Sequence, residues 1–130
     1  MSQVFSFGGW LPSPPNGTWR IYSKLSNIAL PSKTWVVVDE HPDSNNDAAF
    51  AVQCQGADKA ATAQIIDMPA DFHNGGCGLS FADGHSEIHK WRGSKIGHAP
   101  VRYSLMSLPV GPAGDSFVDV NWMADNTTVK

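Results

Sequence analysis

The sequence contains no long hydrophobic run, few charged residues and only two cysteines. No stretch approaches the roughly 18 apolar residues of a membrane-spanning helix, and the first residues have neither the basic region nor the apolar core of a signal peptide. A clustered basic stripe is also missing and the net charge is -3, which argues against a nucleic-acid-binding surface. Two cysteines fit no zinc pattern by themselves. These absences exclude a membrane-spanning helix in this sequence and a nucleic-acid partner.

The residues that are present indicate one globular domain. In 130 residues the hydrophobic fraction is 42%, and 12 glycines and 9 prolines predict many turns. Composition sets a proline- and glycine-rich arm (1–19) apart from the rest of the chain, which ends in a C-terminal segment (92–130). Pro12, Pro14 and Pro15 should keep the arm extended or looped over the domain.

Short apolar runs predict strands. The β-branched run 34–38 is typical of a central strand buried on both faces. Further strands are expected at 48–54 and 63–68, and either a strand or an extended segment at 101–108. Glycine and basic residues predict a loop over 92–99, and Asp115-Ser116 could cap a short final helix. The predicted fold is mainly β, an antiparallel sheet of about five strands with long loops and little helix.

The most informative stretch lies between residues 71 and 91. Alternating residues lead to Asp83-Gly84, which is typical of a type I′ hairpin turn, and a returning strand follows. Nine residues separate His73 from Asp83, and three of them are glycines. We therefore expect His73 to fold back onto the turn and to donate to the Asp83 carboxylate or to a turn carbonyl.

The spacing from His73 to Asp83-Gly84 resembles that of the prepilin-type processing-associated domain of pilin-like and type II secretion pseudopilin-like proteins. The segments 24–32, 36–40 and 43–47 resemble further blocks of that family in the same order, so the likeness covers about residues 20–91. The resemblance implies a pseudopilin-like globular head, α+β in the parent family, without catalysis. It also implies export to the periplasm or cell surface, and protein partners in a pilus-like or secretion assembly.

The sequence departs from this family at its N-terminus. Such proteins begin with a basic leader and a long apolar helix, whereas here residues 1–5 lead directly into Gly8-Gly9 and Trp10. A filament role is therefore not carried over by the resemblance alone, and membrane contact is expected only through an N-terminal helix that this sequence lacks. Without that helix, one face of the sheet needs another cover.

An acidic loop follows the first predicted strand and offers oxygen ligands suited to calcium. The candidate ligands are Asp39, Glu40, Asp43, Asn45 and Asp47. Three of them repeat the first, third and fifth positions of a calcium-binding loop, but Ala48 and Cys54 replace its glycine and glutamate. Calcium binding is one prediction; the major pseudopilins are similar in being calcium-dependent, although their site lies in a different loop. The alternative is an Asx-turn loop whose side chains bond their own backbone.

A second cluster contains His73, Asp83, His85 and His89, residue types that suit zinc, copper or iron. The alternative function is a small metal-dependent hydrolase that uses His73, Asp83 and His85. A triad with Ser80 or Cys77 as nucleophile has the residue types but no motif that places the nucleophile.

The two cysteines, Cys54 and Cys77, form a disulfide in an exported protein and stay free otherwise.

Overall fold

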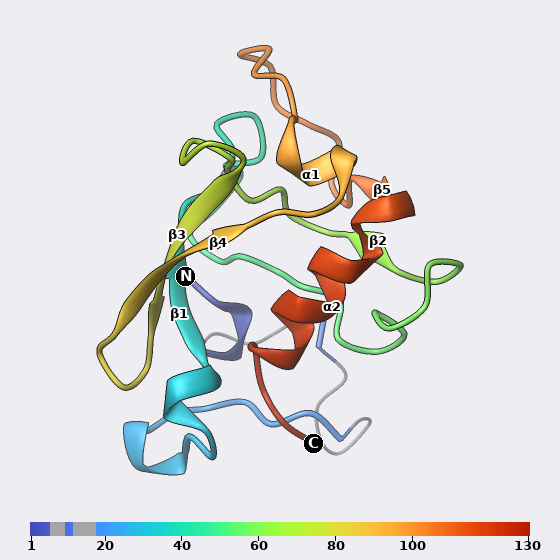
Figure 1. The fold of residues 1–130 in the computed structure, drawn as a ribbon. Helices are drawn as coiled ribbons and strands as arrows, with labels where there is room; N and C mark the ends of the chain where they lie inside the picture. The colour runs from blue at the N-terminus through green and yellow to red at the C-terminus, as the bar shows by residue number, and fades with distance from the viewer. Residues whose placement is uncertain (6–9, 12–17) are drawn as a thin grey trace.

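A three-stranded antiparallel sheet forms one side of the molecule (Figure 1). The computed structural model describes residues 1–5, 10, 11 and 18–130, and the sheet contains β1 (Trp35–Val38), β3 (Gly76–Phe81) and β4 (Ser86–Lys90) in the order β1-β3-β4. Along β3 the side chains alternate, as a half-buried strand requires. The buried face carries the large residues Leu79 and Phe81, and the outer face carries Gly78 and Ser80.

The hairpin between β3 and β4 confirms the strongest prediction, but its turn differs from type I′. The Phe81 amide donates to the His85 carbonyl at 2.9 Å, and the Gly84 amide donates to the Phe81 carbonyl at 3.0 Å. Gly84 has a φ of 95°, whereas Asp83 is not among the described residues with positive φ. This is the three-residue loop in which a single left-handed glycine follows the turn.

The prediction that the 34–38 run forms a central strand is wrong, because β1 lies at the edge of the sheet. Trp35 is fully buried and meets the Phe50 ring edge-on, but Val37 is 50% exposed on the outer face. A β-branched run favours a strand without fixing its neighbours. Chain segments outside the sheet bind the free edge instead: the Ser2 amide donates to the Val36 carbonyl, and the Trp35 amide to the Asn126 carbonyl.

The strands belong to two small sheets rather than to one. The second sheet pairs β2 (Gln64–Ile65) with β5 (Gly111–Pro112), so the strand predicted at 63–68 is present but much shorter. Neither 48–54 nor 101–108 forms a strand. In 48–54, a side chain takes the place of a neighbouring strand as a backbone partner: Asp67 Oδ2 accepts from the Ala51 amide at 2.6 Å.

Helices are short, as predicted. The final helix α2 (Phe117–Asp125) is confirmed, whereas 92–99 contains a short helix, α1 (Ser94–Gly97), in place of a pure loop. Single 3-10 turns lie at η1 (Gln3–Phe5), η2 (Leu25–Asn27), η3 (Pro31–Lys33) and η4 (Gly114–Ser116). Among the described residues, no helix is long and apolar enough to cross a membrane.

A single cluster of buried hydrophobic residues connects the two sheets and α2. It extends along the chain from Val4 to Ala124, and the buried face of α2 contributes Val120 and Met123. In the N-terminal arm, Trp10 is half-exposed and Trp19 packs partly against this core. The prolines expected to shape the arm lie outside the described residues.

Candidate functional site

The outer face of the three-stranded sheet is open and bears a shallow groove of about 500 Å³. Its floor consists of small residues, Gly78 and Ser80 of β3 and Ser86 of β4, because these positions alternate outward. Val37 and Ile88 flank the floor and are 50% and 57% exposed. No described element packs onto these two side chains closely enough to bury them, so the face is an apolar surface facing solvent.

His73 lies at one end of this groove, and its partner is Asp39, not Asp83. The two side chains are 3.2 Å apart, from Nε2 to Oδ2, and both are about half exposed. Asp39 Oδ2 also accepts from the Gly78 amide at 3.0 Å. A Cβ at Gly78 would come within 2.9 Å of that oxygen, so the glycine makes room for the carboxylate. The contact thus fastens the 71–75 turn to the end of β1 and to β3.

Asp83 lies at the opposite end of the hairpin and pairs with His85. Its Oδ1 is 2.5 Å from His85 Nδ1 and accepts from the His85 amide, and these bonds lower the pKa of Asp83. The His85 ring stacks on Phe81 at 4.3 Å between centroids. The His73 side chain lies beside Gly78, three residues before the end of β3, whereas Asp83 lies in the turn beyond that end, so His73 does not join Asp83 and His85. The expected lock between His73 and the turn is therefore wrong, and the hydrolase cluster is not assembled.

The acidic loop contains a network of buried hydrogen bonds rather than a group of carboxylates that converge on one point. Asp43 is buried, and its two oxygens accept from the amides of Arg102 at 2.6 Å and Ser104 at 3.1 Å. His41 is also buried; its Nδ1 accepts from the Asp43 amide, and its Nε2 contacts the Ala99 carbonyl at 3.3 Å. Asp43 thus holds a distant loop in place, a role that neither prediction for this segment contained.

The other candidate calcium ligands point to separate partners. Glu40 accepts from the Ser44 hydroxyl, and Asp47 accepts from the Ala49 amide at 2.6 Å, the local backbone bond of the Asx-turn alternative. Asn45 is exposed. In the described part of the chain, no three His, Cys, Asp or Glu side chains are grouped so that they could hold a metal ion. Calcium binding by this loop stays a prediction.

Two carboxyl groups near this loop have raised pKa values. Burial is the main cause for Glu40 and for Asp67, and nearby acids add to it. The hydrogen bonds from Ser44 to Glu40 and from the Ala51 amide to Asp67 act in the opposite direction. Both groups therefore bind a proton more readily in the folded protein than in the unfolded chain.

The two cysteines are free, buried thiols, so the disulfide expected for an exported protein is absent from the structure, and this observation gives no support to export. Burial raises the pKa of Cys54 to about 12 and raises that of Cys77 as well. A thiol attacks as its thiolate, and neither group ionises near neutral pH. Cys77 therefore does not fit the nucleophile that the triad alternative required.

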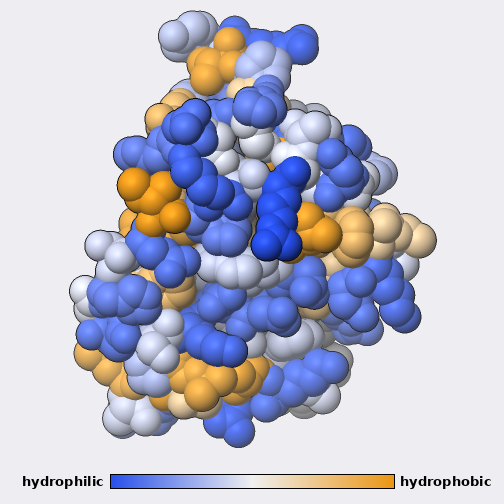
Figure 2. All heavy atoms as spheres, in the orientation of Figure 1, coloured by the Kyte–Doolittle hydropathy of each residue, from blue (hydrophilic) through white to orange (hydrophobic). Residues whose placement is uncertain are grey.

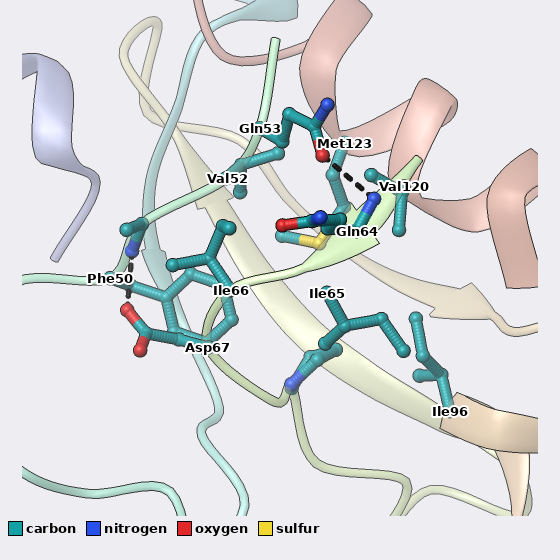
Figure 3. A pocket seen from close by; sticks show the side chains of 12 residues that line it. Phe50, Val52, Gln53, Gln64, Ile65, Ile66, Asp67, Ile96, Val120 and Met123 are labelled. Carbon is teal, nitrogen blue, oxygen red and sulfur yellow. Dashed lines mark hydrogen bonds between the residues drawn. The ribbon is translucent and has the colours of Figure 1, made fainter. Parts of the chain in front are cut away.

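A small hollow lies between β2 and α2 (Figure 3). Val120 and Met123 reach from α2 toward Ile65, and Ile96 closes the far side. Its volume is about 10 Å³, room for roughly one water molecule. This hollow is too small to hold a substrate.

A mixed pocket of about 430 Å³ between β4 and α2 was missed by the sequence reasoning. His89 stacks on Trp122 with the ring centroids 3.5 Å apart, and burial lowers the pKa of His89. Asp119 also lines this pocket, and its carboxylate accepts from the amides of Arg92 and Gly93. The pairing joins residues 33 positions apart, and no local pattern in the sequence signals it.

In comparisons with protein-family models, with curated proteins and with solved structures, no match to this chain was found.

Proposed function

We propose that this chain is the non-catalytic globular head of an exported pilin-like or pseudopilin-like protein, with an assembly or binding role outside the cytoplasm. The observation that supports an assembly role is the bare outer face of the β1-β3-β4 sheet. A sheet normally buries its apolar face against another layer. Here the inner face of the sheet packs against the hydrophobic core, whereas Val37 and Ile88 on the outer face are exposed to solvent.

The partner that this face fits is an apolar face of a helix from another subunit of the assembly. The floor of Gly78, Ser80 and Ser86 has little side-chain volume, so a helix can approach the strands closely and pack between Val37 and Ile88. The thiols of Cys54 and Cys77 are buried and protonated, so neither supplies a nucleophile for acyl transfer, which is in keeping with a binding role.

Photo-crosslinking in producing cells tests this proposal. A photoreactive residue placed at position 37 or 88 should link to a partner subunit, and peptide mapping should locate the link on a helix. The matched control position is Leu25, which is exposed outside this groove. Links from position 25 that equal those from 37 and 88, or no links from the sheet face, would contradict the proposal.

A charge substitution gives a second readout of the same proposal. Val37→Glu and Ile88→Glu each place a carboxylate in the packed layer, and the cost of burying an unpaired charge should prevent assembly. The isolated domain should keep its thermal stability, because both positions face solvent there. A variant that assembles like the wild-type protein would exclude this face.

A further inference from the structure

The segment between α1 and β5 protrudes from the body of the molecule at the end near α1 (Figure 1). It presents large apolar side chains to solvent: Tyr103 is 92% exposed, Leu105 is 64% exposed, and Val101 is partly exposed. Figure 2 shows hydrophobic and hydrophilic atoms side by side on this protrusion. Exposed apolar residues gathered on one protruding loop indicate a contact surface rather than a packing accident.

The tip of this loop is held in a defined conformation. The buried carboxylate of Asp43 accepts from the amides on both sides of Tyr103, at Arg102 and Ser104, and the Asp43 carbonyl accepts from the Met106 amide at 2.6 Å. Tyr103 itself has a φ of 55°, a backbone conformation that bulky residues rarely adopt. The buried Asp43 carboxylate thus holds the backbone around the exposed Tyr103 in one conformation. A loop that is already ordered loses less conformational entropy on binding, which favours contact with a partner.

Basic residues predominate in the loop and in the segment before it, although two carboxylates lie beside them: Asp43 accepts from the loop amides, and Asp115 accepts from the Ser94 amide. Residues 88–114 contain no aspartate or glutamate but contain Lys90, Arg92, Lys95 and Arg102, in a chain whose net charge is -3. At the base of the loop a hollow of about 460 Å³ is lined by Lys95, His98 and Arg102 together with Leu105. The one carboxylate in its wall, Asp43, already accepts two backbone amides. The wall thus carries Lys95 and Arg102 against one carboxylate, and Lys95 Nζ also donates to the Pro112 carbonyl at 2.6 Å. This excess of positive charge favours an anionic group.

We propose that this loop docks on an anionic lipid surface, with Tyr103 and Leu105 inserted at the membrane interface and Lys95 and Arg102 facing the lipid phosphates. A protruding apolar tip matches a deformable lipid layer, whereas a protein partner would need a hollow of matching shape. Tyrosine is a residue favoured at the membrane interface, and nearby basic residues add attraction to anionic lipids. The contact is separate from the sheet-face groove, and it does not depend on the proposed assembly role.

Sedimentation with lipid vesicles tests the proposal on the full chain. We expect binding to vesicles of phosphatidylcholine with phosphatidylglycerol, little binding to phosphatidylcholine alone, and weaker binding as salt is raised. Lys95→Gln with Arg102→Gln should weaken binding roughly thirtyfold, from about one kcal/mol per basic residue. Lys24→Gln with Lys33→Gln removes the same charge outside the loop and should change binding far less.

A second comparison of variants tests the contribution of the apolar side chains to vesicle binding. Tyr103→Ser with Leu105→Ser should weaken vesicle binding by about tenfold or more, whereas Leu25→Ser, at a leucine that is even more exposed than Leu105 but lies in another segment, should not. Circular dichroism and thermal melting should show both variants folded. A wild-type protein that stays in solution with either lipid mixture, or loop variants that bind like the wild type, would overturn the lipid proposal. The first result would leave the loop to a protein partner.

Discussion

Removing the Asp43 carboxylate should loosen the 98–106 loop and destabilise the fold. Asp43→Ala deletes two hydrogen bonds from backbone amides to a charged group, each worth about 1.5–3 kcal/mol. Arg102 and Ser104 are exposed residues, so their freed amides regain water and recover part of this energy. We expect a net loss of about 2–3 kcal/mol in the free energy of unfolding. For a chain of this size, that loss lowers the melting temperature by roughly 8–12 °C.

Two measurements check this expectation together. Urea unfolding gives the loss of free energy, and amide hydrogen exchange gives the protection at residues 102 and 104, which should fall in Asp43→Ala. Asp43→Asn keeps one carbonyl acceptor and should lie between the wild type and the alanine variant. Asp47→Ala removes the same charge from an exposed position of the same loop and should cost much less. An unchanged unfolding midpoint with retained amide protection in Asp43→Ala would refute the reasoning.

Three further predictions concern the same region. A double-mutant cycle of His73→Ala and Asp39→Ala should show a coupling of about 1 kcal/mol or less, because both side chains are half exposed; purely additive effects would show that the contact contributes nothing. The raised pKa values of Glu40 and Asp67 give stability that is full below their ordinary values of 4.5 and 3.8 and is lost as pH rises through the folded-state values. Glu40→Gln with Asp67→Asn should therefore flatten the fall in melting temperature above pH 4, and an equally steep fall in the variant would contradict the assignment. Calcium at about a hundred times its dissociation constant should add roughly 2.7 kcal/mol to stability, and Asp47→Asn should reduce this gain; a melting temperature indifferent to calcium and to chelator would remove the calcium prediction.

Local signals in the sequence predicted the features that depend on neighbouring residues. The Asp83-Gly84 pair located the hairpin, and the pattern after Asp115-Ser116 located α2. Even here the local argument was incomplete. Asp115 accepts from the Ser94 amide and Ser116 accepts from the Ile96 amide, so both serve the start of α1 and not that of α2.

The candidate site depended on contacts that no local pattern reports. Asp39 meets His73 across 34 positions, and Asp43 meets Arg102 across 59. A spacing motif suggested Asp83 as the partner of His73, but the hairpin keeps those two residues at opposite ends of a strand. The sequence also gave no sign that Tyr103 is exposed, because this residue belongs to an alternating segment for which a strand or an extended segment was expected. Sequence patterns thus predicted individual helices and strands better than the contacts that these elements make with distant parts of the chain.

The edge of β1 also determines the order in which the chain can fold. The Trp35 indole donates to the Thr127 hydroxyl at 2.9 Å, and the Trp35 amide donates to the Asn126 carbonyl. These contacts span about 90 residues, so a nascent chain on the ribosome cannot form them until residues 126 and 127 have left the exit tunnel. Until then the Trp35 amide and indole lack their partners Asn126 and Thr127. Contacts between residues so far apart in the sequence also form slowly. The contact between Ser2 and Val36 can form early on this edge, whereas the part of the edge at Trp35 is completed only at the end of synthesis.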